Sequence, residues 1–291
     1  MPDINLISIS PSQLSGTGEA GLYDVAAFQK KYLAQGDSWF SIGNIPPWST
    51  TNLLQQMVLS RASLAVNCAR PGVALAHMTD TSTAQVFLNL LNGRIAWKWD
   101  GLLMSGGGND LIDAANAPPE APLHQRILLA PAEWGGGPDP SRYLSEPGWA
   151  TFESHIAEVV DLLLAQRDKK AINRDIPVFF HTYDYMTPRD APAGPAQGPW
   201  LFKAVNAYQI PEGDWNAVSD LLIDRHAALW LNLAANLAGR NVHVVDSRGA
   251  TTRAERRTEG ESHDWENEIH PTANGYALLA RKWRPLLDTL T

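Results

Sequence analysis

The sequence predicts an α/β protein of three layers, in which helices cover both faces of a doubly wound, mostly parallel sheet of five strands. Two observations support this prediction. Short apolar runs alternate with helical patterns five times along the chain, and no repeat period is visible. Because parallel strands need long crossover connections, which are usually helices, this alternation is typical of one parallel sheet with helices on both faces.

The expected strands are short apolar runs that end at turn-forming residues. The first 28 residues are polar and rich in glycine and serine, so we expect a leader segment on the surface, followed by one domain over residues 29–291. The five expected strands cover 32–36, 62–69, 100–105, 176–181 and 241–246.

The expected helices have apolar residues at helical spacing. The clearest covers 149–166, where Phe152, Ile156, Val159 and Leu163 recur on one face. The other expected helices cover 52–61, 79–91, 214–238 and 272–287.

Two long insertions, 111–148 and 183–213, follow the third and fourth strands and are rich in proline, glycine and aromatic residues. Loops longer than about 15 residues inside a compact domain are usually functional lids or disordered, and the tryptophans favour an ordered role here. Because ligands bind at the carboxyl edge of such sheets, we expect both insertions to wall a cleft there.

The composition argues against several classes of partner. The net charge is −8 and no block of lysine or arginine is present, which argues against nucleic acid and anionic membrane surfaces. Cys68 is the one cysteine, so an intrachain disulfide and a cysteine-based metal cluster are excluded. No apolar run approaches the ~20 residues of a membrane span, and the start of the chain lacks the pattern of a secretion signal. We therefore expect a cytoplasmic protein, or one exported without a cleavable signal.

Ser38 is the first candidate for chemistry. The apolar run 32–36 stops at Gly36, and glycine tolerates the positive φ of a tight turn, so the chain can present Ser38 at the carboxyl edge of the sheet. A Gly-Asp-Ser tripeptide also fits a surface turn capped by its own side chains. The interpretation of Ser38 as a nucleophile therefore depends on the stretches that accompany it.

Four short stretches follow expected strands or precede the last helix, so they converge at one edge of the sheet. They are Gly36-Asp37-Ser38, Ala69-Arg70-Pro71-Gly72, Gly107-Gly108-Asn109-Asp110 and Asn267-Glu268-Ile269-His270-Pro271. In this order they resemble the signature of the SGNH (GDSL-type) hydrolase superfamily, over residues 30–285. The resemblance implies a flavodoxin-like fold and a serine esterase or lipase, which cleaves carboxylic esters through an acyl-serine intermediate without a cofactor.

The resemblance also implies a role for each matched residue. Ser38 would be the nucleophile and His270 the base that takes its proton, since imidazole titrates in the useful range. The oxyanion hole would consist of the backbone N–H groups of Ser38 and Gly72 and the side-chain amide of Asn109.

The third member of the triad departs from the family pattern. The family usually has aspartate three residues before the histidine, whereas this chain has Asn267. An asparagine can accept a hydrogen bond from the imidazole but cannot balance the charge of an imidazolium. We expect Asn267 to orient His270, with Asp264 as the next candidate, followed by Glu266 and Glu268. A Ser–His dyad supported by a backbone carbonyl is a further arrangement.

Trp39 and Trp48 lie closely after Ser38, and we expect them to contact the acyl or leaving group of the substrate. His181 and Tyr183 follow the fourth strand and either contact substrate or pack in the interior.

Two other functions fit the same residues or the same fold. An acyltransferase would use the same residues if the cleft excluded water and held an acceptor alcohol. A catalytically silent binding module is conceivable because of Asn267. His263 and His270 lack the spacing of zinc hydrolases, so we expect no metal. The expected substrate is an ester of a small molecule, a lipid or an acylated carbohydrate, and the pattern does not choose among them.

Overall fold

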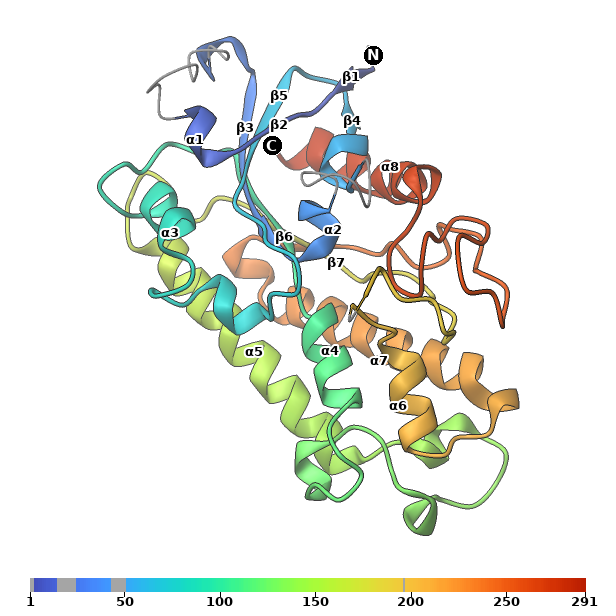
Figure 1. Ribbon diagram of the computed structural model, residues 1–291. Coiled ribbons are helices and arrows are strands. Elements are labelled where there is room, and N and C mark those ends of the chain that lie inside the picture. The colour runs from blue at the N-terminus through green and yellow to red at the C-terminus, as the bar shows by residue number, and fades with distance from the viewer. Residues whose placement is uncertain (1–2, 15–24, 43–50, 196) are drawn as a thin grey trace.

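The computed structural model describes residues 3–14, 25–42, 51–195 and 197–291 (Figure 1). Its main sheet has six strands in the order β2-β5-β3-β6-β7-β8, and every neighbouring pair is parallel. A second, two-stranded antiparallel sheet pairs β1 with β4. The strands are β1 (Ile4–Asn5), β2 (Ile7–Ile9), β3 (Lys30–Gly36), β4 (Val58–Leu59), β5 (Ser63–Asn67), β6 (Gly101–Ser105), β7 (Val178–His181) and β8 (Val242–Val245).

Helices cover both faces of the main sheet, as the sequence predicts. Figure 1 shows α3, α5 and α7 on one face and α2 and α8 on the other. The crossovers from β5 to β6, β7 and β8 all advance in one direction, and right-handed crossovers then place their helices on the same face. The helices are α1 (Pro11–Leu14), α2 (Ser38–Ser41), α3 (Gln85–Leu91), α4 (Gly108–Ala115), α5 (Glu146–Asp168), α6 (Leu201–Ala207), α7 (Trp215–Asn236) and α8 (Ala273–Leu290).

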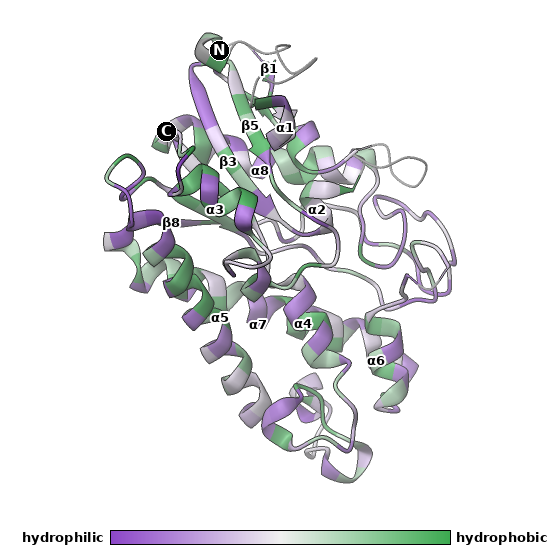
Figure 2. Ribbon diagram, turned by 60° about the vertical axis from the view of Figure 1, so that its left-hand side comes forward, coloured by the Kyte–Doolittle hydropathy of each residue, from purple (hydrophilic) through white to green (hydrophobic). Residues whose placement is uncertain are grey.

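The core lies between these layers. Strand residues such as Leu33, Leu64 and Leu102 are fully buried. Ile156 and Leu163 of α5 are buried too, on the face that the helical spacing predicts. Figure 2 shows hydrophobic and hydrophilic residues side by side along α5, as expected of a helix with one buried face. Among the described residues, no helix combines the length and hydrophobicity needed to cross a membrane.

The start of the chain differs from the expected surface leader. Leu6 and Ile9 are buried, and β2 adds a sixth strand to the sheet by pairing with β5, Ile7 opposite Leu64. A three-residue strand is too short to show a period, and its backbone hydrogen bonds at a sheet edge leave no trace in the side-chain pattern.

Two expected helices are also corrected. The stretch 52–61 forms a short 3-10 turn and β4, whose backbone pairs with β1 instead of continuing a helix. The helix expected over 79–91 begins only at Gln85, because the carboxylate of Asp80 accepts hydrogen bonds from the backbone of a preceding turn.

The topological switch point of the main sheet lies between β3 and β6. From β3 the chain passes to β5 on one side, whereas from β6 it passes to β7 on the other. Ligands bind outside the carboxyl ends of strands at such a reversal. Ser38 lies two residues after the end of β3 and Asn109 four residues after the end of β6, so both lie at this point.

Candidate active site

Ser38 is the first residue of α2 and is 7% exposed. A Cβ at Gly36 would lie 2.8 Å from the Cβ of Ser105, so glycine is required by the close approach of β3 and β6. The positive φ expected at Gly36 is absent, since this residue is not among the left-handed glycines. Asp37 then caps α2, and its Oδ1 accepts from the backbone N–H of Trp39 at 3.0 Å.

His270 lies beside Ser38, although 232 positions separate them in the sequence. Its Nε2 is 2.9 Å from Ser38 Oγ, and its Nδ1 is 3.0 Å from Oδ1 of Asn267. All three residues are buried. The structure therefore brings the three predicted triad residues into one hydrogen-bonded chain.

The amide of Asn267 is fixed by the backbone. Its Oδ1 also accepts from the N–H groups of Ile269, at 3.2 Å, and His270, at 3.0 Å. Backbone N–H groups only donate, so this atom is the oxygen and the imidazole Nδ1 must carry a hydrogen. The lone pair of Nε2 then faces the Ser38 hydroxyl, which is the tautomer a general base requires.

Two of the alternative carboxylates are bound elsewhere. Asp264 accepts from the backbone N–H of Thr252 at 2.7 Å and from Asn274 Nδ2 at 2.6 Å. Glu268 is 1% exposed, and its carboxylate accepts from the backbone N–H groups of Trp200 and Phe202. The backbone N–H of Glu266 donates to the carbonyl of His270 at 2.9 Å.

Burial controls the charge of the imidazole. It lowers the pKa of His270 from 6.5 to about 3, because a charged ring would lose its hydration there. The ring is therefore neutral at ordinary pH and free to accept a proton. Asn267 carries no charge that would offset this effect of burial.

The expected oxyanion donors occupy different positions. Asn109 and Ser38 line the same small cavity, and Asn109 Nδ2 donates one hydrogen bond to the carbonyl of Val73 at 3.1 Å. An amide nitrogen has two hydrogens, so one remains for a ligand. Gly72 lies in the exposed turn before Val73, at a φ of +71°, and is not part of the cavity lining.

A buried network of polar side chains adjoins Ser38 through the neighbouring Asp37. Oδ1 of Asp37 accepts from Ser105 Oγ at 2.7 Å, and Ser105 Oγ lies 2.9 Å from His181 Nε2. Tyr183 donates its hydroxyl hydrogen to the other oxygen of Asp37. Burial raises the pKa of Asp37 to about 6 and lowers that of His181 to about 3. These residues are packed and bonded, and they join the carboxyl ends of β3, β6 and β7.

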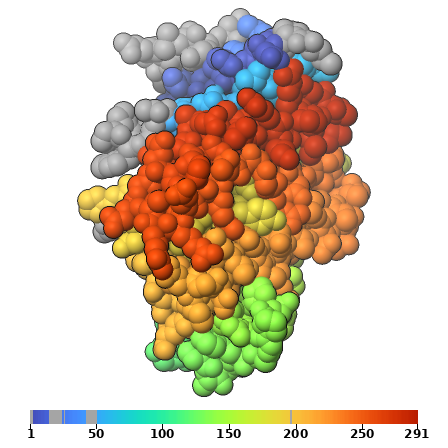
Figure 3. All heavy atoms as spheres, turned by 90° about the vertical axis from the view of Figure 1, so that its right-hand side faces the viewer, coloured from blue at the N-terminus to red at the C-terminus, as the bar shows by residue number. Residues whose placement is uncertain are grey.

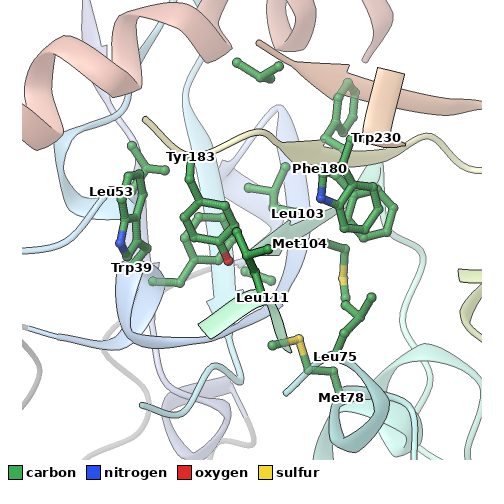
Figure 4. Packing of buried hydrophobic residues seen from close by; sticks show 14 of the residues in the cluster. Trp39, Leu53, Leu75, Met78, Leu103, Met104, Leu111, Phe180, Tyr183 and Trp230 are labelled. Atoms are coloured by element: carbon green, nitrogen blue, oxygen red, sulfur yellow. The ribbon is translucent and has the colours of Figure 1, made fainter. Parts of the chain in front are cut away.

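Trp39 packs mainly among these buried residues. It is 3% exposed, and its Nε1 donates to the carbonyl of Ile269 at 3.1 Å, directly before His270. Figure 4 shows Trp39 and Leu111 on either side of Tyr183. Trp39 contributes to the cavity beside Ser38, so the expected substrate contact stays a prediction. Trp48 lies outside the described residues.

The insertion 183–213 contacts His270 through Trp200, a residue that the sequence interpretation missed. The ring of Trp200 meets that of His270 edge to face, with 5.3 Å between centroids. The segment 247–270 covers much of the face shown in Figure 3, above the chain from this insertion. The available signal for Trp200 as a site residue was the presence of a tryptophan in a loop rich in proline and glycine.

Arg189 fastens the loop that carries Asn267. It is 1% exposed, and its guanidinium donates to the carbonyls of Asn267 at 2.7 Å and Thr258 at 3.1 Å, and to that of Gly260. Burial lowers its pKa, yet an arginine stays charged. Nothing in the local sequence distinguishes this arginine from one on the surface.

We expect Arg189→Met to lower the free energy of unfolding by about 2–4 kcal/mol, because several charged hydrogen bonds to buried carbonyls are lost. The turnover number should fall with it, since Asn267 loses its anchor. Urea unfolding and kcat for an ester measure the two effects. Arg256→Met, on the exposed part of the same loop, is the control and should change stability by less than about 0.5 kcal/mol. Equal effects of the two variants would contradict the anchoring role.

Over the part of the chain that the structure describes, no group of three or more His, Cys, Asp or Glu side chains is arranged to hold a metal ion.

Comparisons with known proteins give structural neighbours. No family model matches the sequence, and no curated protein matches it. An extracellular lipase from Streptomyces rimosus is 16% identical, with a TM-score of 0.48, over 90% of this chain and 100% of that chain. Phospholipase A1 from Streptomyces albidoflavus is 12% identical, with a TM-score of 0.44, over 90% and 99%. A member of the lipolytic G-D-S-L family from Veillonella parvula is 13% identical, with a TM-score of 0.40, over 87% and 96%. The solved structures that this chain resembles therefore include lipolytic enzymes.

Proposed function

We propose that this protein is a serine ester hydrolase, which cleaves carboxylic esters through an acyl-serine intermediate. The observation that carries the proposal is the continuous chain of hydrogen bonds Ser38–His270–Asn267, with distances of 2.9 and 3.0 Å. A nucleophile bonded to a base, and a base bonded to an orienting group, is the arrangement that activates a serine.

Acylation follows from this geometry. Ser38 Oγ attacks the ester carbonyl carbon while its proton passes to Nε2 of His270. The carbonyl oxygen becomes an oxyanion, which the second hydrogen of Asn109 Nδ2 and the backbone N–H of Ser38 would stabilise; Gly72, outside the cavity lining, is left out of this role. One such donor is worth about 10²–10³ in turnover. His270 then gives the proton to the leaving alcohol, and the acyl group stays on Ser38.

Deacylation repeats these steps with water. His270 takes a proton from the water molecule as it attacks the acyl carbon, and it returns the proton to Ser38 Oγ. The carboxylic acid leaves, and the enzyme is restored. Acylation and deacylation each begin with a neutral imidazole that accepts a proton, and the low pKa of His270 provides this neutral form over the ordinary pH range.

The test is labelling together with hydrolysis. We expect the protein to hydrolyse p-nitrophenyl acetate and to react with a fluorophosphonate at Ser38, as located by peptide mass spectrometry. An acyltransferase would label in the same way, but it would release ester rather than acid when an acceptor alcohol is added. A protein that neither labels nor hydrolyses a panel of short esters would contradict the proposal and favour a binding module.

A further inference from the structure

A small apolar cavity adjoins the reacting atoms. Ser38 and Asn109 both line it, so it lies where the acyl group of an acyl-serine would extend from Oγ. Its volume is about 20 Å³. A cavity needs about 10–15 Å³ to hold one water molecule, so this one has room for a methyl group but not for an alkyl chain.

The lining of this cavity is mainly apolar. Its side chains come from α2, α4, α7 and the segments beside β7 and His270, and most of them are apolar. The apolar members are Trp39, Leu111, Ile112, Met186, Ile223 and Ile269. Asp37 and Tyr183 also line it, but the tyrosine hydroxyl donates to the aspartate, whose other oxygen accepts from Ser105. The cavity therefore suits a small uncharged tail without hydrogen-bonding groups.

We propose that the acyl group taken by Ser38 is acetyl, and that the cavity excludes longer acyl chains. This inference rests on the proposed ester hydrolysis and adds the substrate class: acetyl esters, whatever the alcohol. The excluding groups are held rigidly. Ile223 is 1% exposed within α7, and Ile112, at 7%, lies on α4, one turn after Asn109. A tightly packed interior resists the movement that a longer chain would require.

The test compares kcat/KM for p-nitrophenyl acetate, butanoate and octanoate. One methylene in an apolar pocket changes this quantity about 10-fold to 200-fold. We expect the wild type to prefer acetate over butanoate by about 100-fold or more. In Ile223→Ala the preference should fall by at least about 10-fold, through a gain on butanoate, because three carbons are removed from the wall. Ile223→Val, which removes one carbon and disturbs the core least, should lie between the two.

Leu222→Ala is the matched control. Leu222 is the preceding residue of α7 and equally buried, but it does not line the cavity, so its truncation should leave the preference unchanged. A wild type that labels at Ser38 and hydrolyses butanoate as well as acetate would overturn the acetyl inference and leave the esterase proposal standing. An equal change of preference in Leu222→Ala would overturn the inference too. Failure of both labelling and hydrolysis would overturn the esterase proposal, and the inference with it.

Discussion

Replacing Ser38 by alanine is expected to lower kcat/KM for p-nitrophenyl acetate by about 10⁴-fold while the protein stays folded. In a serine protease with a complete triad, removal of the nucleophile costs about 2 × 10⁶ in turnover. This protein has no carboxylate at Asn267, so part of that factor is already absent from the wild type. The loss is therefore expected to be smaller than in the complete triad, but still large.

The fold should tolerate this change. The Ser38 hydroxyl has His270 as its hydrogen-bond partner, so alanine leaves one buried nitrogen unpaired, at a cost of about 1–3 kcal/mol. Thermal unfolding checks this directly. Ser41→Ala is the matched control, because Ser41 is a buried serine of the same short helix whose Oγ donates to the carbonyl of Asp37 at 2.8 Å. Ser41→Ala should keep activity within about tenfold of the wild type. A folded Ser38→Ala variant that stays active would show that another group attacks the ester.

The parts of the site that the sequence predicted are those that depend on local pattern and on sheet topology. Ser38 follows an apolar run that ends at a glycine, and Asn109 follows another such run, so parallel strands bring both to one edge. His270 precedes a helix with a clear apolar spacing. The position of Asn267, three residues before it, allows a turn in which one side-chain oxygen accepts from Ile269, from His270 and from the imidazole.

The parts that the sequence did not predict depend on contacts between distant residues. The carboxylate of Asp264 accepts hydrogen bonds from Thr252 and Asn274 and is therefore bound away from His270. Neither contact can be predicted from the spacing of these residues in the sequence. Arg189 is buried only because the loop around Asn267 folds over it. Polar side chains such as Ser105 show no period that would identify a partner across the sheet.

Replacing Asn267 by aspartate is expected to raise kcat/KM about 10-fold to 100-fold. The side-chain oxygen already fixes the imidazole in the correct tautomer, so the substitution adds only charge. A carboxylate about 4 Å from an imidazolium is worth about 4 kcal/mol at an effective dielectric constant of 20. When about half of this interaction energy stabilises the transition state, kcat/KM rises about 30-fold. The ~10⁴-fold effect of the reverse change in a serine protease arises through the wrong tautomer, which the backbone donors prevent here.

The same substitution should move the acid limb of the pH profile. Only neutral His270 accepts the serine proton, so kcat/KM falls as pH drops through the pKa of this residue. With a wild-type pKa of about 3, that fall lies in strongly acidic solution. A neighbouring carboxylate favours the imidazolium, raises the pKa and brings the fall to higher pH. Burial raises the pKa of Asp37 to about 6 and that of Glu268 to about 7, so these carboxyl groups also change charge near neutral pH. A change of kcat/KM near pH 6–7 is therefore assigned to His270 only when the imidazole itself titrates there.

An NMR titration of the His270 Cε1–H resonance measures the pKa of this imidazole. A fall of kcat/KM at the same pH is then assigned to His270. Asn267→Ala is the control that removes orientation and adds no charge, so it should lower kcat/KM where Asn267→Asp raises it. If Asn267→Asp left both the rate and the imidazole titration unchanged, Asn267 would not be the partner of His270. The opposite signs expected for the two Asn267 variants separate orientation from charge, the two functions that an aspartate combines in a complete triad.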